Sequence, residues 1–157
     1  MTDPLAPLLD LYPATRAVLR RQLDGLTEAQ LLTVPDGFRN HIFWNVGHLV
    51  VSQQILCYRL SGLPLHVSDD LVAHFGRGTS PLDWTTTPDL AEVLGLFDTL
   101  PERMREDVAA GRFTDFTPYQ TTTGPHLGSL ADALAFTFFH EGLHTGVVMA
   151  QKKLVGG

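Results

Sequence analysis

Apolar side chains recur at three- and four-residue steps in four separate stretches of the chain, the spacing that places them on one face of a helix. The first stretch shows it through Leu5, Leu8, Tyr12 and Leu19. No stretch alternates apolar and polar residues convincingly enough to predict a strand. The pattern therefore predicts an all-α protein with four helices, at about residues 4–23, 40–60, 87–110 and 129–153.

Capping residues and prolines refine these helices. Asn40 and Ser129 are placed to cap the second and the fourth. A proline inside a helix removes a backbone donor, so we expect Pro13 to kink or split the first helix. Pro101 predicts a bend in the third helix for the same reason.

Two connections are long and rich in polar residues, glycine and proline: residues 61–86 and 112–128. We expect both to be loops, although loops of this length are unusual between the helices of a bundle, and such loops often cover a site. Two long connections among four helices indicate a four-helix bundle with long crossover connections, not a simple up-and-down series.

Composition and charge exclude several classes of protein. A chain of 157 residues fits one domain, residues 1–157, large enough to fold without a disulfide or a structural metal. The net charge of −6 and the lack of a basic block exclude nucleic acid as a partner. The longest uncharged run, residues 41–58, is interrupted by polar side chains, so we expect no membrane span. A single cysteine and an amino terminus without a signal-peptide pattern predict a cytoplasmic protein.

The fourth predicted helix carries two histidines, His140 and His144, four residues apart. Residues with this spacing lie about 40° apart around a helix, so both imidazoles can reach one metal ion. A helical zinc peptidase is excluded, because those enzymes take a third ligand from downstream and the 13 residues after His144 include no His, Asp, Glu or Cys. The third ligand must lie upstream. His48 is the best candidate, because a histidine in an apolar segment needs a partner.

The motifs Asn-Val-Gly-His at residues 45–48 and His-Glu-Gly-Leu-His at residues 140–144 resemble those of the DinB-like (YfiT-like) superfamily of metal-binding four-helix bundles. The resemblance spans nearly the whole chain and includes Leu-Ser-Gly-Leu at residues 60–63. It implies a three-histidine site for a divalent metal ion, usually zinc or nickel. The ligands on this sequence are then His48, His140 and His144. Val147 departs from the family, which often has glutamine at that position, so no polar role is expected there.

Other polar side chains lie near the predicted ligands on the same two helices. Asn45, Ser52 and Thr137 could each accept a hydrogen bond from the second ring nitrogen of a ligating imidazole, or could make ordinary helix hydrogen bonds. Trp44 lies one turn before His48, where it could form a pocket wall or pack in the core. These four residues are therefore candidates for supporting the site.

Glu141 lies between the two histidines of the last helix. It is a candidate general base, and equally a candidate for a salt bridge at the edge of the bundle. Cys57 is nine positions from His48, so we expect it to face away from the site as a buried thiol. His74 and His126 lie in the two long connections and could reach the mouth of a site.

Three neutral imidazoles leave a fourth coordination position open, which is typical of a catalytic metal site. We predict a metal-dependent enzyme with a small-molecule substrate: a hydrolase, or a transferase that uses a low-molecular-weight thiol, since the resemblance implies relatives of both kinds. The alternative is a metal-binding bundle without turnover that serves as a stress-response or binding module. We expect a homodimer, because the last helix carries a second apolar stripe and relatives are often dimeric.

Overall fold

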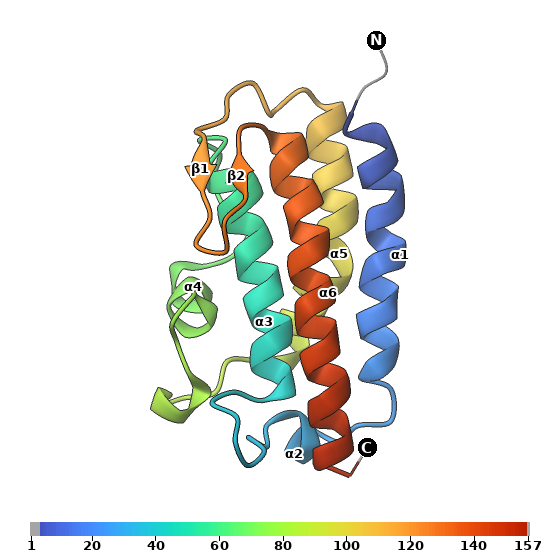
Figure 1. Ribbon diagram of the computed structural model, residues 1–157, viewed down its shortest axis with the longest axis vertical. Coiled ribbons are helices and arrows are strands. Elements are labelled where there is room, and N and C mark those ends of the chain that lie inside the picture. Colours follow the sequence, from blue (N-terminus) through green and yellow to red (C-terminus); the bar gives the residue numbers. More distant parts are fainter. Residues whose placement is uncertain (1–3, 157) are drawn as a thin grey trace.

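Four long helices build the molecule, and they are α1 (Ala6–Gln22), α3 (Ile42–Gln53), α5 (Leu90–Ala109) and α6 (Leu130–Leu154) (Figure 1). The computed structural model describes residues 4–156. Helices α1 and α3 each contact both α5 and α6, so α1 lies diagonally across the bundle from α3. The predicted all-α bundle is confirmed.

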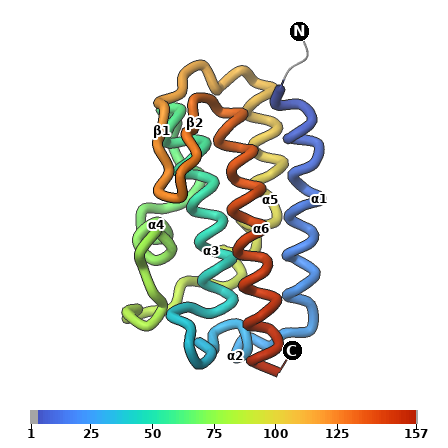
Figure 2. The backbone as a smooth tube through the Cα atoms, viewed as in Figure 1, coloured from blue at the N-terminus to red at the C-terminus, as the bar shows by residue number. Residues whose placement is uncertain are grey.

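The connection between α3 and α5 is a crossover. These two helices follow one another in the chain yet run in the same direction, while α1 and α6 run the opposite way (Figure 2). The chain must therefore return along the whole bundle between them, as the long connection predicts.

This crossover is more ordered than the expected loop at residues 61–86. It contains the helix α4 (Asp69–Phe75), which packs on α3, and the 3-10 turn η2 (Pro81–Asp83). Ser68 caps α4 by accepting from the backbone N–H of Leu71, and Leu71 and Phe75 are buried one turn apart. Two buried residues are too few to give a periodic signal in the sequence, so the prediction was wrong here.

The other connections also hold short elements that the sequence pattern does not predict. The helix α2 (Glu28–Leu31) follows a capping box in which Thr27 and Gln30 satisfy each other's backbone donors. Within residues 112–128, the strands β1 (Tyr119–Gln120) and β2 (His126–Leu127) pair antiparallel. A two-residue strand is too short to show alternation, so the expectation of a plain loop was wrong there too.

The prolines of α1 and α5 do not divide their helices, because each freed carbonyl finds a new donor on the facing helix. Pro13 cannot donate to the oxygen of Leu9, which instead accepts from Arg105 Nη2 at 2.7 Å. Pro101 likewise frees the oxygen of Phe97, which accepts from Arg16 Nη1 at 2.8 Å. The expected split at Pro13 does not occur.

Helix α3 is the most enclosed element, since all of its residues except Ser52 are buried. His41, not the predicted Asn40, caps it: the His41 Nδ1 atom accepts from the backbone N–H of Trp44 at 2.9 Å. The helix continues as a π-helical segment, η1 (Gln54–Arg59). On the fourth helix, Ser129 is the cap, as predicted. Within residues 4–156, no helix has the length and apolar character needed to cross a membrane.

Candidate metal centre

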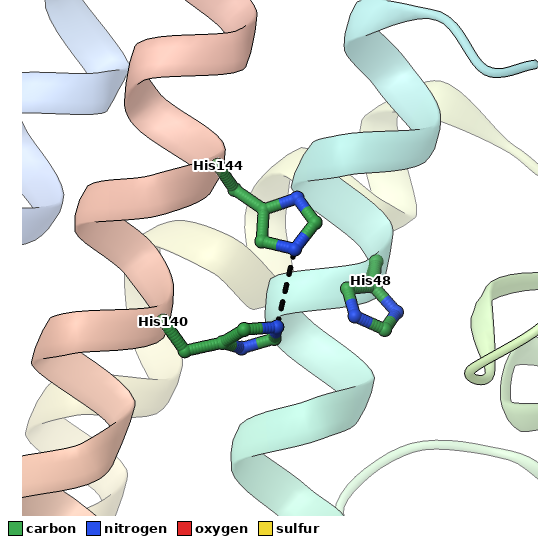
Figure 3. A group of neighbouring side chains, drawn as sticks. All are labelled: His48, His140 and His144. Atoms are coloured by element: carbon green, nitrogen blue, oxygen red, sulfur yellow. Dashed lines mark hydrogen bonds between the residues drawn. The ribbon is translucent and has the colours of Figure 1, made fainter. Parts of the chain in front are cut away.

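His48 on α3 and His140 and His144 on α6 converge between their two helices (Figure 3). One nitrogen from each imidazole can be chosen so that all three lie within 4.8 Å of one another. The Nε2 atoms of His140 and His144 are 3.1 Å apart. The helix packing therefore brings together the three histidines that were singled out from the sequence, and together they form a group that can hold a metal ion.

Asn45 orients His144. The His144 Nδ1–H donates to Asn45 Oδ1 at 2.7 Å, which leaves the Nε2 atom of His144 unprotonated and facing His140 Nε2. The direction of the Asn45 amide is fixed, because its two N–H groups face three oxygens within hydrogen-bond distance: Asn40 Oδ1, the His41 carbonyl and Gln151 Oε1. Gln151 is held in turn by its donation to Asn40. A buried amide network from both helices thus sets the rotation of this imidazole.

His48 is held from the crossover segment. Its Nδ1–H donates to the carbonyl oxygen of Phe75, the last residue of α4, at 2.8 Å. Gly47 allows α4 to come this close, because a Cβ atom at that position would overlap the Phe75 ring. Trp44 stacks on the His48 ring with centroids 4.7 Å apart and planes 9° apart. The unprotonated Nε2 of His48 lies 3.3 Å from Ser52 Oγ, so Ser52 contacts the nitrogen that would bind a metal, not the second nitrogen.

All three histidines are held in the neutral form that metal ligation requires. Burial, with a smaller contribution from His48, lowers the pKa of His140 to about 4. Burial, followed by the charges of His140 and His48, lowers the pKa of His144 to about 3. Burial also lowers the pKa of His48, against the opposing effect of its bond to Phe75. Three neutral imidazoles, two with Nδ1–H already engaged, fit a divalent metal ion.

A cleft of about 280 Å³ opens beside the histidines, and a small molecule in it can reach His48 and His140. One wall is apolar, from Ile55, Leu56 and Phe136. The remaining residues come from α3, the crossover and the β1–β2 hairpin, and they are Ser52, Arg77, Tyr119, Thr121, Thr122 and Thr123. Both long connections therefore contribute to the mouth of the site.

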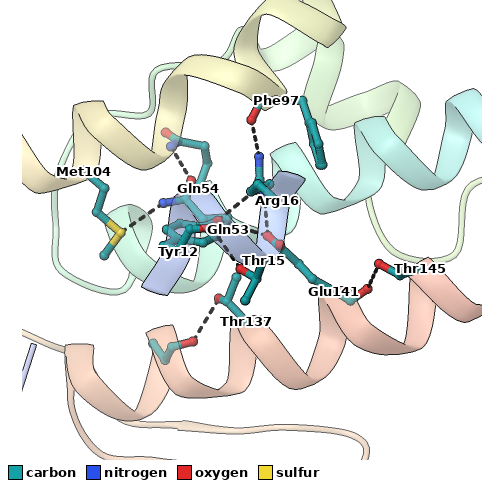
Figure 4. Close-up of polar contacts among 11 residues, drawn as sticks. Tyr12, Thr15, Arg16, Gln53, Gln54, Phe97, Met104, Thr137, Glu141 and Thr145 are labelled. Atoms are coloured by element: carbon teal, nitrogen blue, oxygen red, sulfur yellow. Dashed lines mark hydrogen bonds and ion pairs between the residues drawn. The ribbon is translucent and has the colours of Figure 1, made fainter. Parts of the chain in front are cut away.

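Glu141 does not face the histidines. Its carboxylate accepts from Arg16 Nε at 2.8 Å and from the Tyr12 hydroxyl at 3.0 Å, between α6 and α1 (Figure 4). Both partners of the ion pair are almost fully buried, with 3% and 6% of their side chains exposed. A carboxylate committed to a buried arginine cannot also serve as a base at the metal centre. The salt-bridge alternative describes the geometry, although the bridge lies in the core and not at the edge of the bundle.

The remaining sequence candidates also lie away from the three histidines. Thr137 donates its hydroxyl to the carbonyl of Ala133, an ordinary helix hydrogen bond. Cys57 is fully buried and packs in the core, as expected. His74 contacts Trp84 in a different hollow, and His126 lies in the β1–β2 hairpin beside another hollow.

Several residues that support the site were not predicted from the sequence. Asn40 and Gln151 complete the amide network, and Phe75 fixes His48 through a backbone carbonyl, which leaves no trace in the side-chain sequence. Arg77 lay unnoticed in the first long connection. The only available signal was the placement of Gln151 on the same helix face as His140 and His144, seven residues after His144.

Comparison with known families identifies the chain. A search of curated proteins finds no match. A model of the DinB superfamily matches residues 11–148, which include all four long helices, in part or whole, and the three histidines. The chain belongs to the DinB superfamily.

Proposed function

We propose that this protein is a metal-dependent enzyme that binds one divalent ion, zinc or nickel, through His48, His140 and His144. The observation that carries the proposal is the convergence of three neutral imidazoles whose ligand atoms lie within 4.8 Å of one another beside an accessible cleft. Two of these imidazoles are held by acceptors on their second nitrogen, as ligating histidines are in metalloenzymes. A purely structural site is usually closed by four protein ligands.

The residues around the centre suit acyl transfer to water or transfer involving a thiol. A divalent ion with neutral ligands supplies Lewis acidity and favours the deprotonated form of a water or a thiol. The chain itself binds the substrate in the cleft, excludes water along the apolar wall, and offers the Ser52 hydroxyl next to His48. We therefore propose a hydrolase or a transferase that uses a low-molecular-weight thiol, with a small-molecule substrate.

One observation favours the alternative, a metal-binding module without turnover. Among the described residues, the cleft lining includes no Asp, Glu, Lys or Cys that could act as a general base. In an enzyme with this lining, the activation of the nucleophile depends on the ion and on the histidine cluster. Turnover with any substrate in the screen below would reject the alternative.

The test combines metal analysis with a substrate screen. Purified protein should hold about one equivalent of divalent metal, and His144→Ala should lose it. The metal-loaded protein is then screened against esters, amides and thiol-transfer substrates, with the His144→Ala protein as the control in each reaction. Full metal content in His144→Ala would show that the assignment of ligands is wrong.

We also propose a cytoplasmic homodimer. The exposed residues of α6 between Asp132 and Lys152 are all uncharged, and they are Ala135, Phe139, Gly142, Leu143, Gly146, Met149 and Ala150. Phe139 and Leu143 are each about half exposed. Among residues 4–156, nothing outside the local helix backbone lies within 4 Å of a Cβ added at Gly142 or Gly146, so packing within the subunit does not require glycine there. A second copy could therefore approach this face closely. The single cysteine supports a reducing compartment.

A further inference from the structure

We propose that the cleft beside the three histidines binds a small carboxylate, and that Arg77 holds its negatively charged group. This inference rests on the proposed metal-dependent function and names the substrate class for the same site. It makes Arg77 a residue that determines specificity.

The cleft is locally positive in an acidic protein. The chain as a whole has a net charge of −6. Arg77 is the one residue with a permanent charge in the cleft lining, as far as residues 4–156 are concerned, and no carboxylate lines the cleft to neutralise it. A divalent ion bound by three neutral histidines would add further positive charge a short distance away. The cleft therefore attracts anions although the chain as a whole is acidic.

The Arg77 side chain is available for a ligand. Its guanidinium makes no hydrogen bond or ion pair within the described part of the chain, and the residue is exposed. Arg16 and Arg112, by contrast, are each bound to a carboxylate at 2.8 Å and 3.0 Å. A guanidinium presents parallel N–H donors that match the two oxygens of a carboxylate, so a carboxylate is the anion that Arg77 suits well.

The segment that positions Arg77 also holds one of the metal ligands. It lies two residues after Phe75, whose carbonyl accepts from His48, and directly after Gly76, where α4 ends. The contact between Gly47 and Phe75 fixes α4 against α3. A substrate that reaches from Arg77 to the histidines would therefore be held at both ends by groups whose relative positions are fixed.

The rest of the lining restricts the size and polarity of the ligand. The volume of about 280 Å³ is just below the range of about 300–1,000 Å³ that is usual for sites that bury drug-sized ligands. Ile55, Leu56 and Phe136 suit a short apolar body. The Thr122 hydroxyl can donate a hydrogen bond to the same anion, whereas the Thr121 hydroxyl already donates to the Pro125 carbonyl at 2.6 Å. The expected ligand is thus a small carboxylate with an apolar portion.

The test measures binding of benzoate and of its neutral counterpart benzamide to the zinc-loaded protein by titration calorimetry. A charged hydrogen bond contributes enough that benzoate should bind about tenfold or more tightly than benzamide. Arg77→Gln should lower benzoate affinity about tenfold and leave both benzamide affinity and zinc content unchanged. Arg77→Lys should restore part of the loss. Arg21→Gln, which removes the same charge from α1 outside the cleft, should have no effect.

The zinc content of each sample separates the two ways of failing. If zinc binds at one equivalent but Arg77→Gln binds benzoate as well as the unmodified protein does, the role of Arg77 is overturned and the proposed function stands. The same holds if benzoate and benzamide bind equally. If no zinc binds to the unmodified protein, the proposed function fails, and the substrate class that rests on it fails with it.

Discussion

Replacing Glu141 with glutamine should destabilise the bundle strongly while leaving the metal centre intact. Arg16 is 3% exposed and donates to the Glu141 carboxylate, to the Phe97 carbonyl and, through Nη2, to the Tyr12 hydroxyl. In Glu141→Gln the guanidinium keeps these neutral acceptors but loses the one carboxylate that it contacts among residues 4–156. Removing one member of a buried ion pair costs about 3–5 kcal/mol, because the other charge stays buried. For a domain of this size, a loss of 3 kcal/mol lowers the melting temperature by about 6–12 °C.

The matched control is Asp98→Asn, which makes the same chemical change in an exposed ion pair. Arg20 and Asp98 are 3.3 Å apart with 41% and 46% of their side chains exposed, and such pairs contribute about 0–1 kcal/mol. Chemical denaturation would measure both free energies of unfolding, and metal analysis would follow zinc. A loss of unfolding free energy in Glu141→Gln no larger than that in Asp98→Asn would show that the buried ion pair does not stabilise the bundle. If the Glu141→Gln protein folds but loses zinc, Glu141 contributes to metal binding after all.

Four further outcomes follow from the same geometry. Chelation should lower the melting temperature by several degrees, since a ligand at a thousandfold excess over its Kd contributes about 4 kcal/mol, while the far-UV helical signal at 25 °C persists. Asn45→Ala should weaken zinc binding about 10–100-fold in a competition titration, because His144 loses its acceptor. The pKa values of His140 and His144 are lowered to about 4 and 3, so the unfolded chain takes up protons at a higher pH than the folded protein does. As the pH decreases from 6.5, the free energy of unfolding of the metal-free protein should therefore decrease by up to about 1.4 kcal/mol per pH unit for each imidazole. Denaturation between about pH 7 and pH 4 would measure this decrease. Light scattering should give a dimer that Leu143→Asp converts to a monomer; a monomeric unmodified protein at micromolar concentration would contradict the dimer.

The sequence was informative where a regular helix repeats a signal. Spacing of four residues places His140 and His144 on one face regardless of the rest of the fold, and the long apolar stripes located the four major helices within a few residues. The partner of that pair could be suggested as His48, because an isolated histidine in an apolar helix has few other ways to satisfy its ring nitrogens.

Direction around a helix was harder to predict where neighbouring faces differ little. Glu141 follows His140 directly, and only the position of α1 decides that its carboxylate meets Arg16. The roles of the crossover residues could not be predicted from the sequence either. Phe75 acts through its backbone carbonyl, and Arg77 reaches the cleft because it follows a two-turn helix. Contacts between distant segments leave no local pattern in the sequence. An example is the hydrogen bond that an arginine of the facing helix donates to each carbonyl freed by a proline.

X-ray absorption spectroscopy of the zinc-loaded protein would show directly whether His48, His140 and His144 bind the ion. We expect three imidazole nitrogens at about 2.0–2.1 Å and one further light atom, in a four-coordinate site. His48→Ala, His140→Ala and His144→Ala should each remove one imidazole from the signal or abolish binding. Fewer than three imidazoles in the unmodified protein, or a sulfur atom at about 2.3 Å from Cys57, would contradict the three-histidine centre.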